Sequence, residues 1–348
     1  MTTALLLLAL IVALALFFDF INGFHDTANA IACSVSTRVL APATAIGLAA
    51  TMNLCGALVS TKVAATIGKG ILVPGFVTPE LVIAALVAAI GWNLLTWWWG
   101  LPSSSSHALI GGVAGAGFAA GGASALQLEG LLKIVKSLIG SPLLGFVVGG
   151  TLMIGLYLGC RRWAPGAVRQ TFRPLQVLAA AFISFTHGMN DAQKSMGVIL
   201  LALIGAGALG QGAEVPLWVK VSCAVAMAGG TAVGGWKIIK TMGTKIVKLQ
   251  PINGFAADVT SASVILGASS LGLPVSTTHV AASSILGVGS TRRLSAVRWG
   301  VAGNMVLAWV FTIPITFTLA AGLFGAARSV AGPAPLAAQS QPAVPGAR

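Results

Sequence analysis

Long apolar runs separated by short polar connections constrain this chain more than any other feature. A helix that crosses a bilayer needs about 20 mostly apolar residues. Such runs lie at residues 4–20, 43–60, 81–99, 142–160, 174–186 with 195–208, 219–235 and 299–325. Charged residues make up only 8% of the sequence, whereas soluble globular domains hold about 25%. The sequence therefore predicts an all-α polytopic membrane protein in a lipid bilayer.

The shorter apolar segments 107–122, 259–271 and 279–291 do not span a bilayer comfortably. The last two flank the turn from Pro274 to His279, a pattern that favours re-entrant hairpins. The run at 4–20 lacks the basic start and the cleavage site of a signal peptide, so we interpret it as a membrane helix.

Composition also excludes several partners. The net charge of +13 would suggest nucleic acid in a soluble protein, but the basic residues fall in short connections where membrane topology explains them. The four cysteines form no Cys-x-x-Cys pair for a metal or a redox disulfide. We therefore expect no nucleic-acid partner and no cofactor. The sequence does not indicate the oligomeric state.

The chain repeats itself at nearly constant offsets of 165, 175 and 172 residues. A repeat of this kind predicts two homologous halves, each with a broken helix, a basic connection and a re-entrant or short helical hairpin. The matching segments are Gly23-x-x-Asp26 with Gly188-x-x-Asp191, Lys62–Gly68 with Lys237–Gly243, and Gly100–His107 with Gly272–His279. The predicted divisions are 1–160 for the first repeat, 161–173 for a basic cytoplasmic connection, 174–325 for the second repeat and 326–348 for a disordered tail.

The distribution of basic residues indicates how the halves are oriented, because short cytoplasmic connections are rich in Lys and Arg. If the N-terminus is outside, twelve basic residues fall inside and seven fall on the opposite side. This bias predicts an inverted repeat in the cytoplasmic (inner) membrane. The inside set is Arg38, Arg161, Arg162, Arg169, Arg173, Lys237, Lys240, Lys245, Lys248, Arg292, Arg293 and Arg298.

Two aspartates at membrane depth are the first candidates for function. An ionised carboxylate inside a bilayer is costly and needs a partner. Asp191 has Lys194 three residues later, on the same helical face, while Asn29 occupies the corresponding place beside Asp26. We expect Asp26, Asp191, Lys194 and Asn22 to take part in ion coupling. Asp19 has no counterpart in the second half, so we interpret it as a packing or helix-boundary residue, with contact to the ion path as the alternative.

The two hairpin tips have the composition of an anion site. Each carries Gly-Leu-Pro, then hydroxyl residues and His, then an apolar helix. Proline ends the first arm, hydroxyls cap the second, and its free backbone N–H groups point toward an anion. Hydroxyls, amides and one lysine suit a tetrahedral oxyanion that is later released, and a cation or proton must accompany it past the carboxylates. The candidate substrate-binding residues are Ser103, Ser104, Ser105, Ser106, Ser276, Thr277, Thr278, Asn29 and Asn190.

All four histidines of the chain fall in the repeated motifs. His25 and His187 lie beside the aspartates, and His107 and His279 lie at the hairpin tips. Their spacing matches no zinc pattern, so we expect no resident metal site. We expect these side chains to relay protons.

At these residues the sequence resembles the inorganic phosphate transporter (PiT) family, in particular its bacterial low-affinity phosphate permeases. The resemblance covers residues 4–325 and rests on four motifs in the family's order: Asn22–Ala30, Gly100–His107, His187–Lys194 and Leu273–His279. It implies an inverted-repeat fold that transports inorganic phosphate with a coupling cation. The implied sites fall on Asp26, Asn29, Asp191 and the hydroxyl residues of both tips.

One position departs from the sodium-coupled members of that family. They have Asn in both copies of the Asp-x-x-Asn pattern, whereas this chain has Lys194 in the second copy. A fixed ammonium could stand where a sodium ion would bind, which favours proton coupling, with a divalent metal–phosphate complex as one form of the substrate. Sodium coupling and transport of sulfate or another oxyanion remain as alternatives.

Two other classes of membrane protein fit the sequence less well. An ion channel would need a selectivity filter such as Thr-Val-Gly-Tyr-Gly, which the sequence lacks. An enzyme would need a nucleophile elbow or a His/carboxylate cluster at catalytic metal spacing, and the sequence has neither. We therefore expect a transporter and not an enzyme.

Overall fold

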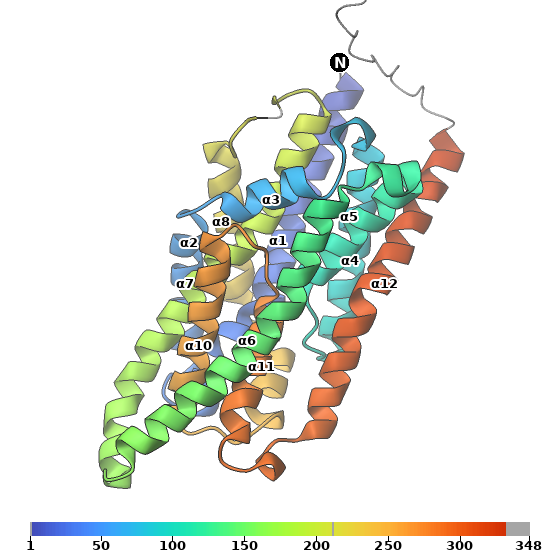
Figure 1. The fold of residues 1–348 in the computed structure, drawn as a ribbon. Coiled ribbons are helices and arrows are strands. Elements are labelled where there is room, and N and C mark those ends of the chain that lie inside the picture. Colours follow the sequence, from blue (N-terminus) through green and yellow to red (C-terminus); the bar gives the residue numbers. More distant parts are fainter. Residues whose placement is uncertain (1, 211, 332–348) are drawn as a thin grey trace, which may run out of the picture.

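The computed structural model describes residues 2–210 and 212–331 as a bundle of helices (Figure 1). The first half contains α1 (Thr2–Ser36), α2 (Pro42–Ala57), α3 (Lys62–Gly70), α4 (Pro79–Trp99), α5 (Ser105–Gly121) and α6 (Leu128–Cys160). The second half contains α7 (Pro165–Gly205), α8 (Leu217–Val233), α9 (Trp236–Lys240), the π-helix η3 (Thr241–Lys245), α10 (Pro251–Ser270), α11 (Thr277–Ser290) and α12 (Trp299–Ala331). Short 3-10 turns lie at Pro74–Phe76, Gly122–Ala125 and Leu294–Ala296.

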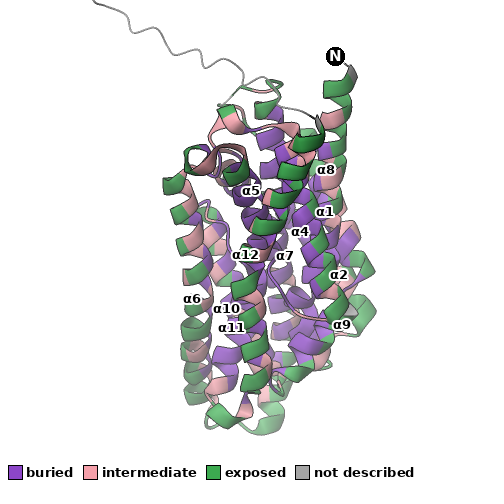
Figure 2. Cartoon of the chain, turned by 90° about the vertical axis from the view of Figure 1, so that its right-hand side faces the viewer, coloured by how far each residue is buried: buried purple, intermediate pink, exposed green. Residues whose placement is uncertain are grey.

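Several of these helices suit a bilayer by length and composition. Among the described residues, five helices are long and apolar enough to cross a membrane, or up to seven if two bent helix pairs each count as one span. The most apolar windows of α6 and α12 are only 17% buried. Figure 2 shows exposed residues along α6, whereas buried residues concentrate in the central helices. Apolar surface outside and polar side chains inside confirm a polytopic membrane protein.

The two halves run in opposite directions and interlock. In Figure 1, α1 descends from the N-terminus while α7 rises beside it in the opposite sense. Helix α1 packs on α8 of the second half, and α7 packs on α2 of the first. A Cβ atom on Gly23 would overlap the backbone of Met227, and one on Gly188 would overlap the backbone of Asn53. The glycine of each Gly-x-x-Asp motif therefore permits the close helix crossing that joins the halves.

Each half has a broken helix, as predicted, but the break lies elsewhere than at the polar motif. Helices α1 and α7 continue unbroken through residues 21–29 and 186–194. The breaks separate α2 from α3 at 67° and α8 from α9 at 64°. Gly234, with φ of 76°, ends α8 in the left-handed region that glycine tolerates. The motifs stay helical because their polar side chains find partners inside the bundle.

Two predicted boundaries also differ from the helices observed. Helix α7 begins at Pro165, so much of the connection predicted at 161–173 is helical. Helix α12 continues to Ala331, into the tail predicted at 326–348. Residues 332–348 of that tail lie outside the described residues.

Candidate functional site

The tips of the two hairpins, α4–α5 and α10–α11, meet inside the bundle. Gly100 and Gly272 reverse the chain with φ of 67° and 69°. Ser104 caps α5 and Ser276 caps α11, each by accepting from a backbone N–H at 3.2 Å. The Ser106 hydroxyl of the first tip donates to the Val275 carbonyl of the second at 3.0 Å. The predicted helix caps are therefore present, and they bring two helix N-termini together.

Each hairpin is held by the basic segment of the opposite half. Lys62 Nζ donates to the Ser270 carbonyl at 3.1 Å, and Thr66 donates to the Gly272 carbonyl at 2.7 Å. In the same way, the Lys237 ammonium donates to the Trp98 carbonyl at 3.2 Å, and the Thr241 hydroxyl donates to the Gly100 carbonyl at 3.1 Å. The repeated segments Lys62–Gly68 and Lys237–Gly243 thus each hold the hairpin of the other half. The sequence showed their similarity but not this role.

Asp26 is the carboxylate of the first half, and hydroxyls from both hairpins reach it. Its Oδ2 lies 2.9 Å from the Ser105 hydroxyl, and its Oδ1 lies 3.2 Å from the Thr278 hydroxyl. His25 Nδ1 lies 2.7 Å from the same Oδ1. Asp26 is 1% exposed. These partners compensate a buried negative charge, so the ionised carboxylate is stable here.

Asp191 is the carboxylate of the second half, and it forms the ion pair predicted with Lys194. Lys194 Nζ donates to Asp191 Oδ1 at 2.6 Å, and both side chains are fully buried. The Thr277 hydroxyl of the second tip donates to Oδ2 at 3.0 Å. An ammonium and a carboxylate compensate each other away from water only when they are paired this closely.

The asparagines connect the carboxylates to the tips. Asn29 donates to the Thr278 hydroxyl at 2.9 Å. Asn22 lies between the halves, with its amide nitrogen 3.5 Å from Asp191 and its carbonyl 2.7 Å from the Ser105 hydroxyl. Asn190 instead donates to the Ser269 hydroxyl of α10 at 2.7 Å. The structure therefore groups Asn22 and Asn29 with the carboxylates and places Asn190 against the hairpin arm.

The four histidines divide into two pairs. His25 contacts Asp26, and His187 Nε2 lies 3.5 Å from Asp191 Oδ2. The rings of His107 and His279 lie 4.4 Å apart, and His279 stacks on Trp309 at 4.0 Å. The first pair contacts the carboxylates, whereas the second pair packs the two tips together.

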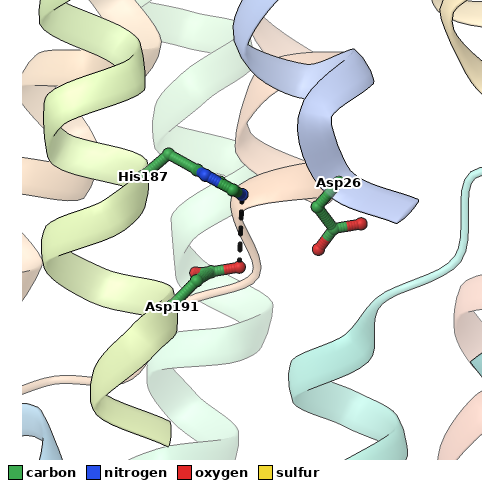
Figure 3. A group of neighbouring side chains, drawn as sticks. All are labelled: Asp26, His187 and Asp191. Atoms are coloured by element: carbon green, nitrogen blue, oxygen red, sulfur yellow. Dashed lines mark ion pairs between the residues drawn. The ribbon is translucent and has the colours of Figure 1, made fainter. Parts of the chain in front are cut away.

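Three of these groups could hold a cation. The carboxylate oxygens of Asp26 and Asp191 and a ring nitrogen of His187 lie within 4.8 Å of one another. Figure 3 shows Asp26 on α1 facing His187 and Asp191 on α7. His187 Nε2 has no hydrogen-bond partner among the described residues. Two oxygens and an imidazole nitrogen are a donor set that suits a first-row divalent metal better than sodium.

Sequence reasoning missed several polar residues that support the site. Thr96 joins His25 at 3.3 Å to Ser103 at 2.7 Å. Gln193 caps the start of α3 by accepting from the Val63 N–H at 2.8 Å. Asn53 contacts His187 Nδ1 at 3.1 Å. The only signal was polarity within an apolar run, because the partners are far away in sequence.

Two antiparallel repeats, broken helices and facing hairpin tips around buried carboxylates define a secondary transporter of the inverted-repeat class. The particular family follows from comparison with known proteins. The chain belongs to the phosphate transporter family, whose profile matches residues 22–165 and 159–320. The double match confirms the internal repeat, and membership of a transporter family confirms that the protein is not an enzyme.

Individual relatives extend this result. The chain is 52% identical to a "Probable low-affinity inorganic phosphate transporter" of Bacillus subtilis, over 92% of this chain and 97% of that protein. It is 50% identical to a protein of the same description from Rhizobium meliloti, over 95% and 99%. A solved structure described as "The sodium-dependent phosphate transporter" superposes with a TM-score of 0.86 at 26% identity, covering 95% of this chain and 100% of that one.

Proposed function

We propose that this protein is a symporter that moves inorganic phosphate across the cytoplasmic membrane together with protons. Family membership supports phosphate as the substrate, and so do the descriptions of the relatives that match nearly the whole chain. The transported oxyanion would bind in front of the N-termini of α5 and α11. Ser105, Thr277 and Thr278 would supply hydroxyl donors there, together with backbone N–H groups.

The buried pair of Lys194 with Asp191 carries the proposal of proton coupling. In this pair the Lys194 ammonium donates a hydrogen bond to one oxygen of the Asp191 carboxylate at 2.6 Å. A sodium ion at the same position would meet a fixed positive charge, and two unit charges about 4 Å apart repel by about 4 kcal/mol at an effective dielectric constant of 20. The first half retains the neutral Asn29 beside Asp26, so the two halves treat a cation differently.

A divalent metal that enters bound to phosphate is a second form of the substrate, because the negative charge of the phosphate would offset the repulsion between the metal and Lys194. Lys194 occupies Oδ1 of Asp191, while Oδ2 faces His187. Asp26 and His187 Nε2 complete a possible ligand set with that oxygen. These residues would then receive the metal of a metal–phosphate complex and position its phosphate against the tips.

The orientation of the chain is part of the same proposal, with the N-terminus outside. Residues from the basic connections meet at one end of the molecule. Arg173 donates to the Arg38 carbonyl at 3.4 Å. Lys248, Arg292, Arg293 and Arg298 line one cavity there. The positive-inside rule assigns such an end to the cytoplasm.

Phosphate uptake in a transport-deficient host tests the proposal, with pH, sodium and magnesium varied independently. We expect uptake that rises with external acidity and does not require sodium. Excess unlabelled sulfate should compete poorly with labelled phosphate. Uptake that requires sodium would favour sodium coupling, and strong competition by sulfate would favour a broader oxyanion permease.

A further inference from the structure

Asp19 is a buried carboxyl group that the phosphate site does not use. It precedes Asp26 by about two turns of the continuous helix α1, and its side chain is fully buried. Among the described residues, no group donates a hydrogen bond to either of its oxygens. Asp26 and Asp191, by contrast, each receive hydroxyl donors and a nitrogen partner.

The surroundings of Asp19 come mainly from α7 and α8. The Ser195 hydroxyl of α7 faces its carboxyl group, yet that hydroxyl also lacks a hydrogen-bond partner among the described residues. The charged groups that act on Asp19 are Asp191 and Lys194 of α7, and its titratable neighbour on α8 is Cys223.

Titratable groups on α9, α10 and α11, which also pack on α1, have contacts elsewhere. His279 of α11 stacks on the ring of Trp309 at 4.0 Å. Asp258 of α10 faces Cys33 near the opposite end of α1. Lys237 of α9 lies over the ring of Trp98 at 4.4 Å. The charged groups that act on Asp19 are thus the two members of the ion pair in the second half.

Burial without donors determines the protonation state of Asp19. An ionised carboxylate that is moved away from water without hydrogen bonds or a paired charge is strongly disfavoured, and such a group takes up a proton instead. Asp19 is therefore neutral in this conformation, whereas Asp26 and Asp191 have the hydrogen-bond partners that Asp19 lacks. A small movement that brings Ser195 and Lys194 closer would favour release of its proton.

Asp19, like Lys194, is an ionisable residue whose counterpart in the other half of the chain is neutral. At the repeat offset of 165 residues its counterpart is Ser184, which donates to the Ala180 carbonyl within its own helix. The counterpart of Lys194 is the neutral Asn29. The first half thus has a carboxyl group and the second half an ammonium group where the other half has a neutral residue, and the two groups act on each other.

We propose that Asp19 carries the coupling proton through the transport cycle. The inference rests on the proton coupling proposed above and names the group responsible. On the side of high proton activity, the Asp19 carboxylate binds a proton and forms an O–H bond. On the other side the O–H bond breaks, the proton leaves to water, and Ser195 and Lys194 stabilise the carboxylate. Lys194 remains a fixed charge paired with Asp191 and carries no proton across.

The Asp19→Asn variant tests this role, because an amide copies the size of the protonated carboxyl but cannot release a proton. In proteoliposomes, two quantities are compared: exchange of labelled for unlabelled phosphate at equal pH, and net accumulation driven by a pH gradient. The wild type should accumulate phosphate about tenfold for each pH unit if one proton accompanies each phosphate. Asp19→Asn should keep exchange within about twofold but lose accumulation, and phosphate should no longer drive proton entry reported by an internal pH dye.

Matched variants make the result specific. Asp19→Glu retains a titratable carboxyl and should restore accumulation. Asp258→Asn removes another buried carboxyl, away from this pair, and should accumulate phosphate like the wild type. The proposal is overturned if Asp19→Asn still accumulates phosphate, if Asp19→Glu fails to, or if Asp258→Asn shows the same loss. A wild type that ignores the pH gradient would instead refute the proposed proton coupling itself.

Discussion

Replacement of Lys194 tests how the second half of the site balances its charge. The ammonium donates to Asp191 at 2.6 Å, and both side chains are fully buried. In Lys194→Ala the Asp191 carboxylate would keep two hydrogen-bond donors, the Thr277 hydroxyl at 3.0 Å and the Asn22 amide at 3.5 Å. Removing one partner of a buried ion pair costs about 3–5 kcal/mol. If the cost falls on the transport-competent state, phosphate exchange should slow roughly 10²- to 10³-fold at pH 7.

The assay is exchange of labelled phosphate in proteoliposomes at equal pH on both sides, so that no gradient contributes. Lys194→Asn is the matched variant, because it recreates in the second half the amide that Asn29 provides in the first. We expect Lys194→Asn to be less impaired than Lys194→Ala and to become stimulated by sodium. Wild-type exchange by Lys194→Ala at equal membrane abundance would refute the reasoning, and so would a Lys194→Asn protein indifferent to sodium.

Three further groups of substitutions have distinct expected outcomes. Asp26→Asn and Asp191→Asn should each abolish uptake without reducing insertion, which immunoblotting of membranes can verify; unimpaired uptake would refute the assigned role. Thr278→Val should reduce uptake at least about tenfold, because it removes the hydroxyl of the second half that contacts Asn29 and Asp26 of the first. Thr278→Ser keeps a hydroxyl and should retain most of the uptake. Gly188→Ala should destabilise the detergent-solubilised protein by about 1–3 kcal/mol, because its Cβ would overlap a neighbouring helix; Gly140→Ala, where space is open, should not change the melting temperature.

The sequence predicted the candidate site better than the path of the chain. Asp26, Asp191 and the hydroxyl tips could be identified because polar groups inside long apolar runs are conspicuous, and because repetition pairs them. The ion pair of Lys194 with Asp191 followed from helical spacing alone, and the structure contains it at 2.6 Å.

The helix breaks were harder to place. A polar motif lowers local hydropathy whether or not the backbone breaks, so Asn22–Asn29 resembled an interruption although α1 continues through it. The second break had a local signal in Gly234 and Gly235, but the first falls after Leu58 without glycine or proline between α2 and α3. Its position depends on Gln193, which caps α3 from the other half of the chain.

For the same reason, the sequence could not predict that each basic segment holds the hairpin of the other half. Lys62 and Ser270 are 208 residues apart, and Lys237 and Trp98 are 139 apart. A repeat in the sequence shows that two segments are equivalent. Which hairpin each segment holds depends on the antiparallel packing of the halves.

Proton coupling to phosphate is the central claim, and imposed gradients in vesicles test it most directly. Phosphate uptake by purified protein should be compared under a pH gradient without sodium and under a sodium gradient at equal pH. The account predicts accumulation driven by the pH gradient and none driven by sodium. Accumulation driven by sodium alone would contradict it.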